Sequence, residues 1–130
     1  MNIDLPTLLT LLAYELHSAK RHSRFTSLVM LTSRENLPTV KSVLTDCLRS
    51  SDAMANFDHS VAVLLGETDR LGATLALRRW TSLFHQQIDV QASVASFPND
   101  GDRAEKLLMA AHSRLDKARS HETGTVIVSD

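Results

Sequence analysis

The stretch "RSSDAMANFDHSVAVLL", residues 49–65, decides the fold class. Two short apolar runs, 53–57 and 60–66, stand on either side of a polar turn that carries Asp58, His59 and Ser60. Such a pattern predicts two strands, and we expect them to pair as an antiparallel hairpin. The polar turn also raises the question of whether its side chains do chemistry.

Outward from the hairpin, the chain alternates between helical and strand patterns. Apolar residues at helical spacing, with capping signals, predict helices over 4–21, 38–47, 68–87 and 103–119. Apolar runs bounded by turn residues predict further strands over 24–32, 89–97 and 123–128. The resulting order, α-β-α-β-β-α-β-α-β, predicts an α/β (α+β) fold with a mixed sheet of about five strands flanked by helices. No linker or repeat interrupts it, so we expect one domain over residues 1–130.

The same patterns predict which side chains are buried. We expect a core that includes Leu64, Val94, Leu108 and Leu115. The helix over 68–87 is expected to contribute apolar contacts from Leu71, Leu75, Trp80 and Phe84.

Composition excludes several classes of protein. With 43% hydrophobic residues and a formal net charge of −1, the chain can bury a core but is not built to neutralise nucleic-acid phosphates. The apolar run 5–16 is too short to span a bilayer and lacks the features of a signal peptide, so we expect a cytoplasmic domain without membrane insertion. The single cysteine, Cys47, excludes an internal disulfide and favours a core position. Six histidines show no metal-ligand spacing, so no metal site and no cofactor are predicted.

Four stretches, in order along almost the whole chain, resemble the GGDEF domain, the fold of diguanylate cyclases. The first, "AKRHSRFTSLVML" (19–31), resembles the family's first helix end and first strand, and the second, "RSSDAMANFDHSVAVLL" (49–65), resembles its central hairpin. The third, "VQASVASFPNDGDRAEKLL" (90–108), resembles its strand with the Pro-Asp-Gly turn, and the fourth, "AAHSRLDKARSHETGTVIV" (110–128), resembles its last helix and strand. The resemblance implies a role in signalling by cyclic di-GMP.

The catalytic residues that the resemblance implies are missing. The family's Gly-Gly-Asp-Glu-Phe turn would fall near 58–62, where this chain has "DHSVA". Cyclase chemistry needs glycines for close approach of the nucleotide and carboxylates for divalent cations. Asp58 has no acidic neighbour, and the strand 24–32 runs into Ser33 and Arg34 where the family places aspartates. We therefore predict that the protein is not an enzyme.

One motif of the family is retained. Many cyclases bind their product at an Arg-x-x-Asp motif five residues before the signature turn, and Arg49-Ser50-Ser51-Asp52 has this pattern and spacing. The family also uses an arginine on the helix after the hairpin, which corresponds to Arg79. A guanidinium can bind a phosphate or a guanine edge through two hydrogen bonds. The resemblance thus implies a cyclic di-GMP site at Arg49, Asp52 and Arg79.

Three functions remain open at this point. The protein is a signalling module that binds cyclic di-GMP, a pseudoenzyme that acts only through protein contacts or dimerisation, or a working cyclase of unusual sequence, the least favoured. The first helix has more leucines than one core face needs, namely Leu5, Leu8, Leu9, Leu11 and Leu12. We therefore expect self-association or a partner contact through this helix.

Overall fold

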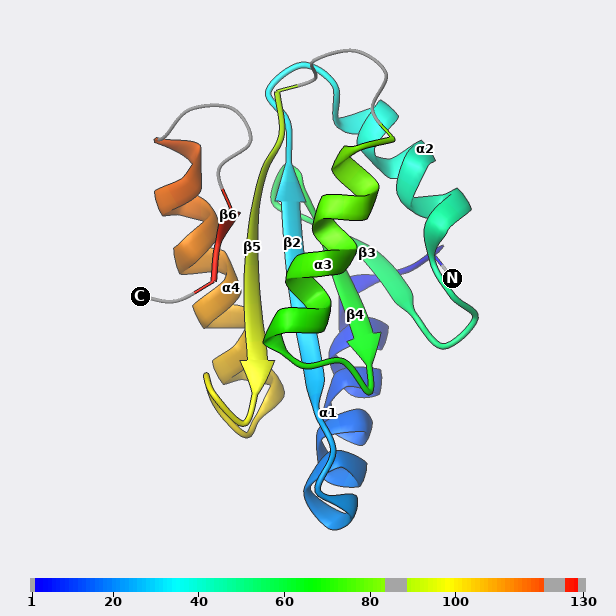
Figure 1. The fold of residues 1–130 in the computed structure, drawn as a ribbon, viewed down its shortest axis with the longest axis vertical. Helices are drawn as coiled ribbons and strands as arrows, with labels where there is room; N and C mark the ends of the chain where they lie inside the picture. Colours follow the sequence, from blue (N-terminus) through cyan, green and yellow to red (C-terminus); the bar gives the residue numbers. More distant parts are fainter. Residues whose placement is uncertain (1, 84–88, 121–125, 129–130) are drawn as a thin grey trace.

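The computed structural model describes residues 2–83, 89–120 and 126–128. Its elements are, in order, β1 (Asn2–Ile3), α1 (Leu5–His22), β2 (Thr26–Thr32), α2 (Leu37–Cys47), β3 (Ala53–Phe57), β4 (Ser60–Gly66), α3 (Arg70–Thr81), β5 (Gln91–Phe97), α4 (Ala104–Arg119) and β6 (Val126–Ile127). The expected fold class is confirmed: helices flank a mixed sheet (Figure 1).

The sheet has six strands in the order β1-β3-β4-β2-β5-β6. The four central strands pair antiparallel, and the two outer strands, β1 and β6, add in parallel. The predicted hairpin is confirmed, with Ala53 opposite Leu64 and Phe57 opposite Ser60. The sequence did not reveal β1, because a strand of two residues that pairs through its backbone with Met54 and Ala55 leaves no side-chain pattern.

Each face of the sheet carries two helices. One core packs α2 and α3 against one face and contains Val29, Leu31, Val40, Leu44, Ala73, Leu77 and Trp80. The other packs α1 and α4 against the opposite face and contains Leu8, Leu12, Leu16, Leu28, Met30, Leu107 and Leu115. Figure 1 shows α3 in front of the sheet and α1 behind it. The central strands are buried on both faces, which explains why β2 and β4 are continuous apolar runs.

The predicted core is mostly correct. Leu64, Val94 and Leu115 are buried, whereas Leu108 is only partly buried because its neighbour Leu107 faces the sheet. Cys47 is also partly buried, and it packs against the core of α2 and α3.

The prediction for α3 was wrong at two positions. Leu71 and Leu75 are exposed, because α3 turns a different face toward the sheet. That face repeats at helical spacing through Ala73, Ala76, Leu77 and Trp80. Phe84, the end of the expected helix at 84–87 and the start of the expected strand at 123–125 lie outside the described residues.

The leucines of α1 are largely used within the chain. Leu8 and Leu12 are buried, and Leu5, Leu9 and Leu11 are partly buried and pack against the same core. The surplus that motivated self-association through α1 is therefore smaller than the sequence indicated. Among the described residues, no helix is long and apolar enough to cross a membrane.

One buried ion pair joins the second half of the chain. Arg114 of α4 bonds Asp100, in the turn after β5, at 2.7 Å, and it also donates to the carbonyl of Val94. The second oxygen of Asp100 accepts from the backbone N–H of Ser96 at 2.8 Å. Arg70, in the first turn of α3, lies 3.5 Å from the same carboxylate. Asp100 thus holds β5, α4 and α3 together.

Candidate functional site

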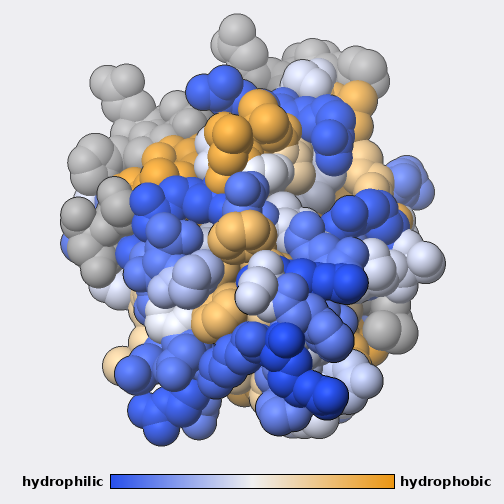
Figure 2. Space-filling view, turned by 60° about the horizontal axis from the view of Figure 1, so that its bottom comes forward, coloured by the Kyte–Doolittle hydropathy of each residue, from blue (hydrophilic) through white to orange (hydrophobic). Residues whose placement is uncertain are grey.

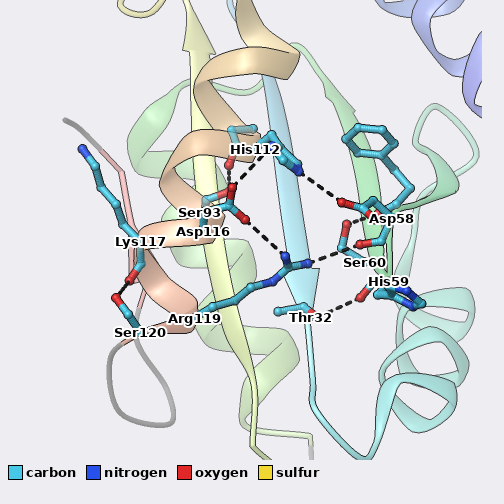
Figure 3. A network of polar contacts seen from close by, with 12 residues as sticks. Thr32, Asp58, His59, Ser60, Ser93, His112, Asp116, Lys117, Arg119 and Ser120 are labelled. Carbon is cyan, nitrogen blue, oxygen red and sulfur yellow. Dashed lines mark hydrogen bonds and ion pairs between the residues drawn. The ribbon is translucent and has the colours of Figure 1, made fainter.

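The hairpin turn consists of two residues in the left-handed conformation. Asp58 has φ 50° and His59 has φ 59°, which is the backbone of a two-residue hairpin loop without glycine. The turn is fixed by side chains on both sides. Thr32, at the end of β2, donates to the carbonyl of His59 at 2.9 Å, and Ser60 donates to the carbonyl of Phe57 (Figure 3).

Side chains of α4 extend to this turn. The Asp58 carboxylate lies 3.6 Å from Nε2 of His112, whose Nδ1 lies 3.7 Å from Asp116. Arg119 donates to the carbonyl of Asp58 at 3.3 Å and pairs with Asp116 at 3.2 Å (Figure 3). The only acidic side chain of the turn is thus directed at a histidine.

These groups do not fit the divalent cation that cyclases require. Within the described ranges, no three His, Cys, Asp or Glu side chains lie close enough together to hold a metal ion. Arg34, just beyond β2, pairs with Asp89 and donates to the carbonyl of Arg119. A site for a nucleotide-bound cation would need paired carboxylates here, and the chain instead supplies Arg34, His112 and Arg119.

A cavity of about 410 Å³ lies at the other end of β4. It is formed by the α2–β3 connection, the end of β4 and one side of α3. Arg49, Asp52 and Arg79, the three predicted site residues, all line it. The structure therefore brings together residues that are 27 to 30 positions apart in the sequence, counted from Asp52 and Arg49 to Arg79.

Arg49 is held in place by four hydrogen bonds from its side chain. Its Nε and Nη2 donate to the two oxygens of Asp52 at 3.2 and 3.0 Å, and Nη2 also donates to the Gly66 carbonyl and to Thr68. The hydrogen bond to Asp52 raises the pKa of Arg49 above its ordinary value. The side chain is nevertheless 58% exposed, and no residue of the described ranges accepts a bond from Nη1. A rigid guanidinium thus offers one free edge.

Asp52 has a different role from the one expected. Its side chain is 3% exposed, and its oxygens accept from Arg49 through both the guanidinium and the backbone N–H. The sequence suggested that both side chains project from the sheet edge toward a ligand. In the structure Asp52 lines the cavity, but its nearly buried carboxylate is engaged in orienting Arg49.

Arg79 completes the cationic side of the cavity. It lies in the last turn of α3, is exposed, and its guanidinium has no partner among the residues that the structure describes. The preceding residue, Arg78, is also exposed but does not line the cavity. The buried ring of Trp80 lies between α3 and the sheet and fixes this turn of the helix.

Sequence reasoning missed two further cavity residues, Phe25 and Asp69. Phe25 was counted as part of a buried strand, but it precedes β2 and remains 45% exposed. Asp69 is the N-cap of α3. The sequence offered one signal for them. Phe25 comes just before one expected strand and Asp69 just after another, and these strand ends lie beside Arg49 in the cavity.

Figure 2 turns this end of the molecule toward the reader. Hydrophobic side chains form a broken line across the centre of the view, and hydrophilic side chains flank it on both sides. This surface thus combines apolar contact area with charged groups.

The fold matches solved structures of GGDEF domains. The GGDEF domain of YfiN (TpbB) from Pseudomonas aeruginosa has a TM-score of 0.89 at 16% identity, with 98% of this chain and 96% of that chain covered. The active GGEEF domain of a diguanylate cyclase from Vibrio cholerae has a TM-score of 0.85 at 12% identity, with 98% and 97% covered.

A third similar structure concerns a ligand. It describes an interaction mode between a microbial GGDEF domain and bis-(3′,5′)-cyclic di-GMP, and has a TM-score of 0.76 at 16% identity, with 92% of this chain and 86% of that chain covered. No protein-family model and no curated protein matches the sequence. At these identities the likeness establishes the fold, which is that of GGDEF domains.

Proposed function

We propose that this GGDEF-like domain is a signalling receptor that binds cyclic di-GMP at the cavity of Arg49 and Arg79 and has no cyclase activity. The observation that carries the proposal is the arrangement of the two arginines. Arg49 is oriented by Asp52, Gly66 and Thr68, whereas Arg79 is unpaired within the described residues, and both line one cavity.

The ligand fits the chemistry of this cavity. Cyclic di-GMP has two phosphates and two guanine bases, and an arginine binds either group through charge-assisted hydrogen bonds. Because Arg49 is already ordered, little side-chain entropy is lost when it binds. The solved structure that describes a GGDEF domain with cyclic di-GMP supports the choice of ligand.

The groups at the hairpin turn support the absence of cyclase activity. Asp58 is the one carboxylate of the turn, and it is directed at His112. Arg34 lies beyond β2, where the family resemblance implies aspartates that hold cations. With these groups, neither the triphosphate nor its cations have the partners that phosphoryl transfer needs.

Incubation with GTP and Mg²⁺ or Mn²⁺ is expected to give no cyclic di-GMP above a protein-free background. Product can be measured by liquid chromatography after extended incubation at high protein concentration. Turnover that is abolished by Asp58→Ala would contradict the proposal, because it would show that the turn retains catalytic carboxylate chemistry.

A matched pair of arginine variants tests the receptor site. Arg79→Ala is expected to weaken cyclic di-GMP binding by about tenfold to a hundredfold, which corresponds to one lost charge-assisted contact. Arg78→Ala removes the same charge from the same helix turn outside the cavity, and it should leave the dissociation constant nearly unchanged. Equal losses in both variants would indicate a general charge effect and would count against the site.

A further inference from the structure

The cavity contains an acidic side chain that the known motif does not include. Asp69 lines the cavity and caps α3, with its Oδ1 accepting from the Gly72 N–H at 2.7 Å. No residue of the described ranges donates to its second oxygen, Oδ2. The side chain is exposed, so this oxygen is available to a ligand.

The other two acidic residues of the cavity are already engaged. Asp52 is buried beneath Arg49, as described above, and Glu67 forms an ion pair with Arg24. A Cβ at Gly72 would lie 3.1 Å from Oδ1 of Asp69, so glycine leaves room for the capping hydrogen bond. Asp69 is therefore the carboxylate that remains open for ligand donors.

Phe25 supplies an aromatic face in the same cavity. The residue is 45% exposed, although it adjoins the fully buried strand β2. Exposed aromatic rings beside arginines are the usual elements of nucleobase binding, because every base can stack on them. Stacking alone does not distinguish one purine from another.

Together, these groups match the edges of guanine. Guanine presents the acceptors O6 and N7, which suit an arginine, and adjacent N1–H and N2–H donors, which suit a carboxylate. Adenine has an acceptor at N1 and no amino group at C2, so it would place an unpaired acceptor against Asp69. The open oxygen of Asp69 thus favours guanine, because it can accept from donors at N1 and N2 that adenine lacks.

We infer that Asp69 is the residue that selects guanine over adenine in this cavity and that Phe25 stacks on the selected base. The inference rests on the proposed function, since it assigns the base-reading groups of the same site. Asp52 then acts as a positioning residue for Arg49, and Asp69 performs the recognition of guanine donors.

Asp69→Asn tests the selection directly. Asparagine caps a helix as well as aspartate does, so α3 should remain intact while Oδ2 is replaced by an N–H₂ donor. The matched control is Asp4→Asn, which makes the same exchange at the N-cap of α1, where Asp4 accepts from Thr7 at 2.8 Å. Dissociation constants for cyclic di-GMP and cyclic di-AMP are measured for each protein.

The wild-type chain and Asp4→Asn are expected to prefer cyclic di-GMP, and Asp69→Asn is expected to reduce this preference by about tenfold to a hundredfold. Phe25→Leu should weaken both dinucleotides by similar factors, whereas Phe25→Tyr should retain them. A wild-type chain that binds neither dinucleotide would overturn the proposed function together with this inference. Binding of cyclic di-GMP with an unchanged preference in Asp69→Asn would overturn the inference alone.

Discussion

Replacing Asp100 with alanine is expected to lower the free energy of unfolding by about 3–5 kcal/mol, the usual cost of leaving one partner of a buried ion pair alone. Arg114 and Asp100 are 3% and 5% exposed and lie 2.7 Å apart. The variant removes the Asp100 carboxylate that the buried Arg114 guanidinium pairs with, and it leaves the Ser96 N–H without its acceptor.

This contribution should depend on pH in a defined direction. Burial by itself raises the pKa of Asp100, but hydrogen bonds from Arg114 and Ser96 and the charges of Arg114 and Arg70 outweigh it and hold the pKa below its ordinary value. A carboxyl whose pKa is lower in the folded state stabilises the fold above its unfolded pKa of about 4. The stabilisation is lost as the pH falls through the folded pKa. The difference between wild type and Asp100→Ala should therefore shrink below about pH 4.

Urea unfolding followed by circular dichroism measures both effects. Asp102→Ala is the matched control, because Asp102 is exposed and only reaches Lys20 and Lys106 at 3.9 Å. It should change stability by about 0.5 kcal/mol or less. Equal losses in the two variants, or a pH-independent difference for Asp100→Ala, would refute the role assigned to the buried pair.

Replacing Arg49 is expected to weaken both ligand binding and the fold. Arg49→Ala should raise the dissociation constant for cyclic di-GMP by about tenfold to a hundredfold, because one charge-assisted contact contributes roughly 1.5–3 kcal/mol. The same variant also removes the two hydrogen bonds that the Arg49 guanidinium donates to the nearly buried Asp52 carboxylate, so a loss of stability is expected as well.

Arg49→Lys separates these two consequences. Lysine keeps the positive charge beside Asp52 but lacks the planar fork that holds Asp52 with one edge and a ligand with the other. It should retain most of the stability and still lose affinity. His59→Ala, in the hairpin turn at the other end of β4, should bind like wild type. Wild-type affinity in Arg49→Lys would show that the fork geometry is not used.

The sequence predicted the hairpin and the mixed sheet because local patterns determine both. Polar residues at 58–60 and apolar runs on either side leave one pairing in register, and the continuous runs 26–32 and 60–66 require burial on both faces. The wrong prediction for α3 arose because its local sequence pattern is ambiguous. Leu71 and Leu75 match a helical stripe as well as Ala73 and Leu77 do, and only tertiary packing selects between the two faces.

The candidate site was predictable only in part. Arg49, Asp52 and Arg79 were chosen by resemblance, and the structure places them in one cavity. The pairing of Arg49 with Asp52 depends on the conformation of the α2–β3 connection, and no sequence pattern encodes it. Phe25 immediately precedes β2, and Asp69 follows β4. Both line the cavity because β2 and β4 are neighbours in the sheet.

Two features at opposite ends of β4 thus support different conclusions. At the hairpin turn, Asp58 is the one carboxylate, and His112 and Arg119 contact it while Arg34 donates to the Arg119 carbonyl. At the cavity lie two arginines, one open carboxylate and an exposed phenylalanine, and the proposed binding of a guanine dinucleotide uses these groups. A receptor without turnover is consistent with both ends.

Isothermal titration of the purified chain with cyclic di-GMP tests the central claim most directly. The account predicts saturable binding with a roughly micromolar dissociation constant, since two or three charge-assisted contacts must offset association costs of several kcal/mol. In the same calorimeter, the Arg79→Ala variant should show a clearly larger dissociation constant than Arg78→Ala. The absence of any binding heat at high micromolar ligand would contradict the account and leave a domain that acts through protein contacts alone.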